Sequence, residues 1–370
     1  MSAAAAELHV VVPEGVDDLR RPSGGNVYDR RVCDALEQLG WSVREHAVAG
    51  RWPSPDAAAH DGLAATLRVV PDGGLVLVDG LVASAAPDEL AAAAGRLRLV
   101  VLVHLPLGVD GDERTRAAER AALSWAVAVV ATSRWTRGWL VETYALAPGR
   151  VHVARPGVDA AELAVGTPAG GQLLCVAAVT PVKGQDLLMG ALAGIADLSW
   201  ECDCVGALDL DAGFVDRVRG LAQAGGIADR VRFTGPLTGA DLDRAYAGAD
   251  LLVLGSRAES FGMVATEALA RGLAVVAPSV GGLAEALGRA GDGTVPGLLV
   301  APGDPEALGA ALRGWLTGVP LRERLRAAAR ERCTSLPTWA DTGQALARAL
   351  SVARLGGAGE PAGGGDRRST

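Results

Sequence analysis

The feature that most constrains the fold is a regular alternation of short apolar runs with stretches of helical spacing. In the first half of the chain the apolar runs are continuous, which is typical of strands buried on both faces of a sheet. This alternation predicts a doubly wound, parallel α/β sheet. The runs lie at residues 8–13, 41–48, 75–78, 99–103 and 127–131.

The same alternation begins again after a segment rich in alanine, glycine and proline. We therefore predict two Rossmann-like domains, which should place a ligand in the cleft where the carboxyl ends of their strands face each other. The second set of runs lies at 173–176, 202–205, 231–233, 251–254 and 274–277. The expected parts are an N-terminal domain at 1–160, a linker at 161–171, a C-terminal domain at 172–337, a helix at 338–355 that crosses back to the first domain, and a disordered tail at 356–370.

Composition excludes several classes of protein. A net charge of −8 argues against a general nucleic-acid binder, which would carry a basic stripe. No apolar run reaches the roughly 18 residues of a membrane span, and no charged-then-apolar leader opens the chain, so we expect a cytoplasmic protein. The five cysteines form neither a zinc set nor a disulfide framework and are expected to be reduced. They are Cys33, Cys175, Cys202, Cys204 and Cys333.

The strongest candidate site follows the apolar run at 251–254. Glu259 and Glu267 stand eight residues apart and flank the predicted start of a helix, whose unpaired N–H groups favour an anion such as a diphosphate. Carboxylates beside an anion site are explained if they bind sugar hydroxyls; the alternative is an acidic pair that only complements the helix dipole. The residues at the helix start are Phe261, Gly262, Met263 and Val264.

Lys183 is the only lysine among 35 basic residues, and it follows the run at 173–176. An exposed lysine could have become arginine without penalty, whereas an ammonium that serves as a point charge on phosphate tolerates that change poorly. We therefore interpret Lys183 as a phosphate ligand, with a solvated surface lysine as the alternative.

Two further candidates belong to the first half of the chain. Gly24, Gly25 and Asn26 lie between the first run and the first helix, where a glycine pair lets a phosphate approach the backbone; the alternative is an ordinary turn. His104 follows the run at 99–103, at the end of a strand where functional side chains gather, although a histidine there can also be structural.

These stretches resemble the family 4 glycosyltransferases, which are retaining, nucleotide-sugar-dependent enzymes of GT-B fold. Glu259 and Glu267 match the E-x7-E signature of that family, and the likeness continues through Gly281 to Glu285. Lys183 matches the lysine of the Gly-Arg-x-x-x-x-Lys-Gly loop, but Ala178 stands where the family has the arginine. The likeness spans roughly residues 8–335 and is stronger in the second half.

The resemblance implies a role for each candidate. Glu267 would bind the ribose of the donor, Glu259 the transferred sugar, and Lys183 with the helix amides the diphosphate. Arg134 and Asp159 are additional candidates. The implied catalytic residues are Lys183, Glu259 and His104. The implied donor-binding residues are Glu267, Phe261, Gly262, Met263, Val264, Gly24, Gly25 and Asn26.

The resemblance also implies the partners. We expect a UDP- or GDP-sugar donor, no cofactor, no metal and a soluble small-molecule acceptor on the N-terminal domain. Residues 1–170 carry 16 arginines against 21 acidic residues, so anionic lipid should repel this domain. Asp209 and Asp211 have Asp-x-Asp spacing but follow a turn-like segment. The alternatives are an epimerase or hydrolase of nucleotide sugars on the same fold, a two-domain Rossmann oxidoreductase, and a sugar-binding protein without activity.

Overall fold

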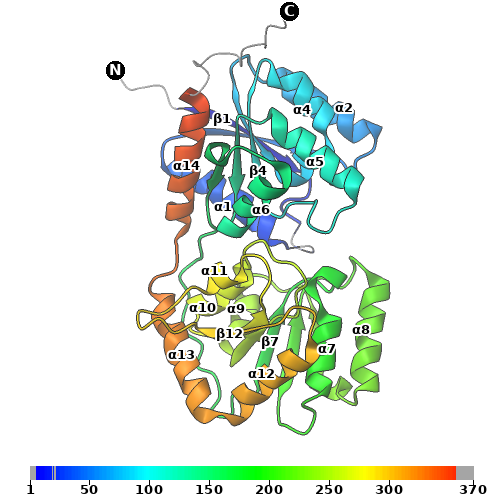
Figure 1. The fold of residues 1–370 in the computed structure, drawn as a ribbon, viewed down its shortest axis with the longest axis vertical. Helices are drawn as coiled ribbons and strands as arrows, with labels where there is room; N and C mark the ends of the chain where they lie inside the picture. Colours follow the sequence, from blue (N-terminus) through cyan, green and yellow to red (C-terminus); the bar gives the residue numbers. More distant parts are fainter. Residues whose placement is uncertain (1–5, 19, 21, 356–370) are drawn as a thin grey trace, which may run out of the picture.

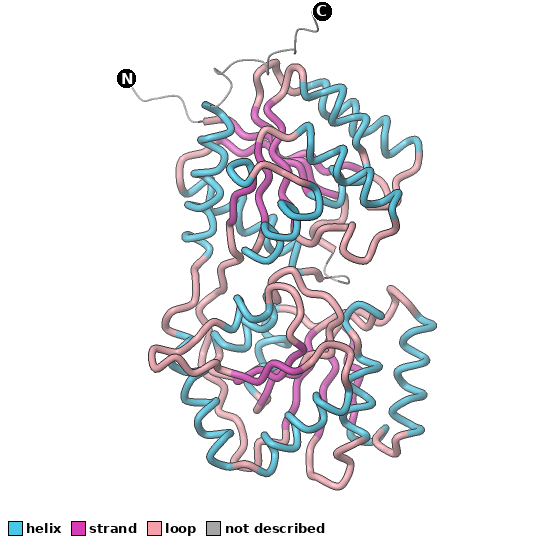
Figure 2. Tube along the Cα trace, viewed as in Figure 1, coloured by secondary structure: helices cyan, strands magenta, loops and turns pink. Residues whose placement is uncertain are grey.

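The computed structural model describes residues 6–18, 20 and 22–355, which form two α/β domains stacked end to end (Figure 1). Each domain has a sheet of six strands with helices packed around it (Figure 2). Every paired strand in both sheets runs parallel to its neighbour. The predicted pair of doubly wound domains is therefore confirmed.

The N-terminal sheet has the order β2-β1-β3-β4-β5-β6. Its strands are β1 (Glu7–Pro13), β2 (Ser42–Val48), β3 (Leu75–Asp79), β4 (Arg98–Val103), β5 (Ala128–Ala131) and β6 (Val151–Val153). Its helices are α1 (Gly24–Gln38), α2 (Ala57–Val69), α3 (Gly80–Ala85), α4 (Pro87–Ala94), α5 (Glu113–Trp125) and α6 (Arg134–Tyr144).

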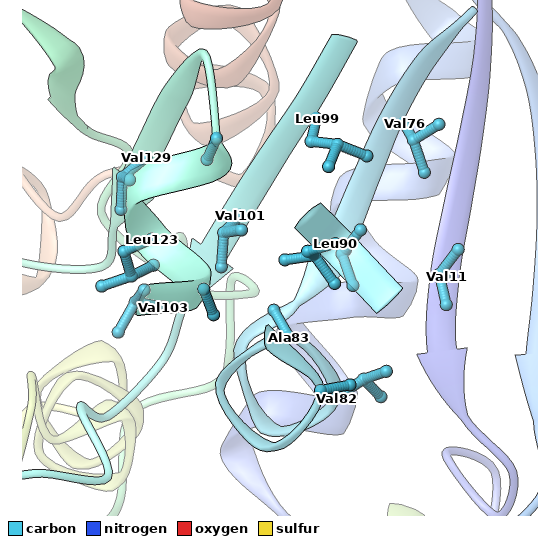
Figure 3. Close-up of a cluster of buried hydrophobic side chains, with 14 of the residues drawn as sticks. Val11, Val76, Val82, Ala83, Leu90, Leu99, Val101, Val103, Leu123 and Val129 are labelled. Carbon is cyan, nitrogen blue, oxygen red and sulfur yellow. The ribbon is translucent and has the colours of Figure 1, made fainter. Parts of the chain in front are cut away.

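Continuous apolar strands allow both faces of this sheet to be buried. On β4, Leu99, Val101 and Val103 pack into one core together with α4 and α5, whereas Val100 and Leu102 point into a second core on the other face. Figure 3 shows the first core, in which Leu99, Val101 and Val103 lie among side chains from neighbouring strands and helices. Successive side chains of a strand point to opposite faces of the sheet, so one apolar strand contributes to both hydrophobic layers.

The C-terminal sheet has the order β12-β11-β10-β7-β8-β9. Its strands are β7 (Gln172–Val176), β8 (Glu201–Val205), β9 (Val231–Gly235), β10 (Leu251–Val253), β11 (Ala274–Pro278) and β12 (Gly297–Val300). Its helices are α7 (Gln185–Ala193), α8 (Ala212–Ala224), α9 (Gly239–Ala247), α10 (Met263–Ala270), α11 (Leu283–Leu287), α12 (Pro305–Thr317) and α13 (Val319–Cys333). The sequence patterns missed β6 and β12, because each is a short strand at the edge of its sheet.

The last helix, α14 (Trp339–Leu355), returns to the N-terminal domain and lies beside its sheet (Figure 1). It packs along α1, and Leu346, Ala349, Leu350 and Ala353 join the hydrophobic core on that face of the sheet. The predicted tail at 356–370 lies outside the described residues. None of the helices in the described part of the chain is long and apolar enough to cross a membrane.

Strand order determines where a ligand can bind. The chain leaves β1 toward β2 on one side and reaches β3 on the other, and the same reversal separates β7 from β10. In open parallel sheets the loops that follow the two strands at such a switch point diverge and leave a crevice for a ligand. The loops after β1 and β3, and those after β7 and β10, are therefore the places to look for a site.

Candidate active site

The loops after β7 and β10 bring Lys183 and Glu259 together. Lys183 ends a short 3-10 turn, Pro181–Lys183, and its Nζ donates a hydrogen bond to Oε1 of Glu259 at 2.7 Å. The hydroxyl of Ser256 donates to the same oxygen at 2.9 Å. The Glu259 side chain is only 9% exposed, whereas Lys183 keeps 32% of its side chain accessible. The switch point thus holds a reachable ammonium that is positioned by a buried carboxylate.

The Lys183 loop is fixed against the loop after β10. Gly184 adopts a φ of 65°, and a Cβ at this position would lie 2.0 Å from the carbonyl oxygen of Gly255, so only glycine fits. The N–H of Arg257 donates to the carbonyl of Val182 at 2.7 Å. The guanidinium of Arg257 makes two hydrogen bonds of 2.8 Å to Asp186, the first acidic residue of α7. The ammonium therefore projects from a rigid support rather than from a loose loop.

Helix α10 begins next to this pair. Gly262 is its N-cap residue with a φ of 94°, and a Cβ there would lie 2.5 Å from Cδ2 of Leu283. Because the cap residue offers no side-chain acceptor, the N–H groups of Met263 and Val264 stay available to a ligand, whereas the N–H of Ala265 donates to the carbonyl of Gly262 at 2.9 Å. The N–H of Gly282 donates to the carbonyl oxygen of Glu259 at 2.9 Å. This bond connects the segment from Gly281 to Glu285 to the site.

Glu267 lies one turn into α10 and is partly covered by aromatic and basic side chains. The Tyr246 hydroxyl donates to Oε2 of Glu267 at 2.8 Å, and the Arg271 guanidinium lies over the Tyr246 ring at 4.4 Å. Burial raises the pKa of the Glu267 carboxyl. Within the described part of the chain no group donates a hydrogen bond to its Oε1, so this oxygen can accept from a ligand hydroxyl.

The opposite face of the cleft, on the N-terminal domain, centres on His104. Its Nε2 lies 2.8 Å from Oδ1 of Asp29 on α1 and 3.3 Å from Oδ2 of Asp79 at the end of β3. Both carboxylates are buried, and they meet His104 because β1, β3 and β4 are adjacent in the sheet. Burial by itself lowers the pKa of His104, but the two carboxylates outweigh that effect and raise the pKa to about 10.

The glycine pair connects the two faces. A Cβ on Gly24 would lie 3.1 Å from Sδ of Met263 at the start of α10, and a Cβ on Gly25 would lie 3.3 Å from Cδ2 of His104. The first turn of α1 therefore stands between His104 and the first turn of α10. The N–H of Asn26 donates to the Ser23 hydroxyl at 3.1 Å, which caps α1.

The additional candidates have structural partners. Glu285 on α11 accepts a hydrogen bond of 2.8 Å from the N–H of Arg134 and forms an ion pair with Arg155, and these contacts join the two domains. Asp159 forms an ion pair with Arg31. The Asp-x-Asp segment ends at Asp211, whose Oδ1 accepts from the N–H of Phe214 and caps α8.

Among the described residues, Asp29, Asp79 and His104 form the group that could hold a metal ion, with ligand atoms within 4.8 Å of one another. The imidazole already satisfies the two carboxylates by hydrogen bonding and charge. The expectation that no metal is needed stays a prediction. The five cysteines are free, and four of them are buried.

Comparison with known proteins assigns the chain to a family. Residues 169–332 match the model for glycosyl transferases group 1, and residues 81–162 match the model for glycosyltransferase family 4. A D-inositol 3-phosphate glycosyltransferase of Catenulispora acidiphila is 34% identical over 307 residues, which are 77% of this chain and 71% of that protein. The chain belongs to glycosyltransferase family 4. A second D-inositol 3-phosphate glycosyltransferase, from Frankia alni, is 34% identical over 62% of this chain, which spans 60% of that protein.

Solved structures agree with this assignment at the level of the fold. A sucrose-phosphate synthase from Thermosynechococcus elongatus superposes with a TM-score of 0.76 at 22% identity, over 93% of this chain and 98% of that one. HepE of Anabaena, solved with UDP and glucose, superposes with a TM-score of 0.71 at 20% identity, over 93% of this chain and 99% of that one. The predicted GT-B architecture and the predicted glycosyltransferase family are thus confirmed.

The sequence patterns missed Asp29 and Asp79 of this family 4 glycosyltransferase. Helical spacing in the sequence could have identified Asp29, because it lies on the same buried face of α1 as Val32, Cys33 and Leu36. A carboxylate on an apolar helix face needs a buried partner. Asp79 ends a strand in which all five residues are buried.

Proposed function

We propose that the chain transfers a sugar from a nucleoside-diphosphate sugar to a small-molecule acceptor, with retention of the anomeric configuration. The observation that carries this proposal is the pairing of Lys183 with Glu259 at the switch point of the C-terminal sheet, next to the first turn of α10. A cation and free helix N–H groups suit a diphosphate, while the adjacent carboxylate suits sugar hydroxyls. One ligand that contains both groups satisfies this arrangement.

The donor would lie along the C-terminal face of the cleft. Glu267 accepts hydrogen bonds from the ribose hydroxyls through its Oε1, the α10 amides and Lys183 hold the diphosphate, and Glu259 binds hydroxyls of the transferred sugar. Donor binding places a phosphate oxygen where the ammonium of Lys183 can donate hydrogen bonds to both the phosphate and Glu259. The presence of UDP and glucose in the solved structure of HepE supports a nucleotide-sugar donor.

In the transfer step the bond between the anomeric carbon and the β-phosphate oxygen breaks, and its electron pair stays on the phosphate. Negative charge grows there, so the fixed ammonium of Lys183 and the helix amides stabilise the transition state more than the ground state. The acceptor oxygen bonds to the anomeric carbon from the same side and passes its proton to the departing phosphate. Nucleoside diphosphate and glycosylated acceptor are the products.

The acceptor would enter from the N-terminal face, beside His104 and the glycine pair. The names of the relatives from Catenulispora acidiphila and Frankia alni refer to an inositol phosphate, which supports an acceptor of small-molecule class. The excess of acidic over basic residues in residues 1–170 supports the same class, since anionic lipid would be repelled.

A panel of UDP- and GDP-sugars, each assayed with and without inositol phosphates as acceptors, tests the proposal. We expect one donor to release nucleoside diphosphate in proportion to the glycosylated acceptor that mass spectrometry detects. Release of nucleoside diphosphate without any acceptor would indicate a hydrolase, and conversion of the sugar without release would indicate an epimerase. Binding of a donor without turnover under any of these conditions would contradict the proposal.

A further inference from the structure

Two buried carboxylates face the imidazole of His104, whereas a neutral ring could donate a hydrogen bond to only one of them. Nε2 faces two carboxylates, Asp29 at 2.8 Å and Asp79 at 3.3 Å, whose side chains are 6% and 3% exposed. One neutral N–H could satisfy one of these anions, but two buried carboxylates without a cation would be costly. A charged imidazolium balances both carboxylates at once. The alternative is a proton on Asp29, because burial raises the pKa of that carboxyl to about 6, and the titration described below distinguishes the two arrangements.

Among residues 6–18, 20 and 22–355, no other cation near the ring takes over this role. The guanidinium of Arg30, the residue after Asp29, forms ion pairs with Asp17 at 2.6 Å and with Glu45. Tyr28 contacts the His104 ring edge-on, but its hydroxyl donates to the carbonyl of Ala154 at 2.8 Å. Across the cleft the neighbouring element is the start of α10, which contributes Met263 near Gly24.

The second ring nitrogen of His104 is left for a ligand. Both carboxylates bind through Nε2, and none of the described residues makes a hydrogen bond to Nδ1. The side chain keeps 17% of its surface accessible. The backbone is fixed as well, because the Thr132 hydroxyl donates to the carbonyl of His104 at 3.0 Å.

From this geometry we propose that Asp29 and Asp79 are positioning residues that hold His104 as a permanent imidazolium, so that Nδ1–H is an obligatory hydrogen-bond donor to an oxygen of the bound substrate. A histidine in this state cannot accept a proton from the acceptor and so cannot act as a general base. The charge state of His104 is inferred from its contacts with Asp29 and Asp79 alone. The contact between Nδ1–H and substrate rests on the proposed glycosyl transfer.

The titration of His104 tests the charge state without any substrate. The chain has five histidines, so two-bond proton–nitrogen spectra of the labelled protein resolve them, and the signal that His104→Gln removes identifies His104. The spectra are recorded with EDTA present, so that no metal ion replaces the proton. We expect His104 to remain doubly protonated from pH 6 to pH 8, with its midpoint about two units or more above that of an ordinary histidine.

Removing one carboxylate should move this titration. In Asp29→Asn we expect the midpoint to fall by about one pH unit or more, because the nearest anion is lost. Asp34→Asn, on the exposed side of the same helix, is the matched control and should leave the midpoint unchanged. If Asp29→Asn does not fold, Asp79→Asn takes its place. A neutral His104 at pH 7 in the unmutated protein, or an unmoved midpoint in the variant, would overturn the proposal.

Activity then separates this inference from the proposed function. The kcat of the unmutated protein should not fall between pH 7 and pH 8.5 through loss of the His104 proton, whereas Asp29→Asn should lose activity as pH rises through its lowered midpoint. Loss of activity in the unmutated protein between pH 7 and pH 8.5 that coincides with deprotonation of His104 would contradict the permanent charge. A locked imidazolium in a protein that turns over no nucleotide sugar would contradict the proposed function alone.

Discussion

The two faces of the cleft use charge in opposite ways. On the C-terminal face the side chain of Lys183 is 32% exposed, and its ammonium pairs with one buried carboxylate, that of Glu259. On the N-terminal face the carboxylates of Asp29 and Asp79 are almost fully buried, and both face Nε2 of His104. One face thus offers a cation that can be shared with a ligand, while the other encloses its anions and offers a single N–H.

The difference teaches how one cleft can serve two substrates. The donor carries two phosphates, so its face needs an accessible positive charge and free amides. The acceptor contributes a hydroxyl or amine, and a free carboxylate next to it would act as a base. Because Asp29 and Asp79 are occupied by His104, the acceptor side presents no free carboxylate of this trio, and the departing phosphate is left to take the proton.

The largest effect should come from removing the cation of the C-terminal face. We expect Lys183→Ala to lower kcat by about 100-fold or more, because the ammonium stabilises charge that develops on the leaving diphosphate. Lys183→Arg should recover only part of this loss, since the planar fork cannot occupy the same point. Steady-state turnover of the donor found in the panel measures both.

A matched control removes an equal charge elsewhere in the same domain. Arg232 on the edge strand β9 is 70% exposed and forms an ion pair with Asp203 on β8. Turnover in Arg232→Ala should match that of the unmutated protein. Normal turnover in a folded Lys183→Ala variant would show that the diphosphate binds elsewhere.

A smaller effect is expected from Glu267, which contributes to binding rather than to the transition state. Glu267→Ala should weaken binding of the nucleoside diphosphate by about 1–3 kcal/mol, because ribose hydroxyls would be left without their acceptor. Titration calorimetry measures this difference, and Glu323→Ala, an exposed residue of α13, is the control. Equal affinity in the two variants would remove Glu267 from the site.

The contrast between the faces also explains what the sequence could predict. Glu259, Gly262 and Glu267 stand within nine residues in one loop and helix, so their spacing alone placed them together. The partners of His104 are dispersed, and Asp29 lies 75 residues away from it. Only the strand order β1-β3-β4 brings them together, and strand order is not encoded in any local pattern.

The stability of the N-terminal face should depend on pH. A pKa of about 10 for His104 lies above the value near 6.5 in the unfolded chain, so its stabilisation is complete below pH 6.5 and is lost as pH rises toward 10. The free energy of unfolding should decrease by at most about 1.4 kcal/mol per pH unit for this one proton.

Urea unfolding between pH 6.5 and pH 9.5 measures that slope. The slope should be shallower in His104→Gln, which has no proton to lose at this position. Parallel slopes in the two proteins would show that His104 carries no stabilising charge.

The smallest expected effect concerns metal. Because Lys183 and the α10 amides neutralise the diphosphate, activity should survive dialysis against EDTA with less than about a twofold change. A loss that magnesium or manganese restores would contradict this expectation. It would direct attention to Asp29, Asp79 and His104, and then to Asp209 and Asp211.

The stereochemistry of the first product tests most directly the central claim that the departing phosphate, rather than a base on the N-terminal face, takes the acceptor proton. Proton NMR of the glycosylated acceptor, recorded during early turnover, gives its anomeric configuration through the coupling of the anomeric proton. The arrangement of the two faces predicts the same configuration as in the donor. Inversion would require a free base opposite the leaving group, such as a neutral His104 or an unpaired Asp29, and would contradict the account.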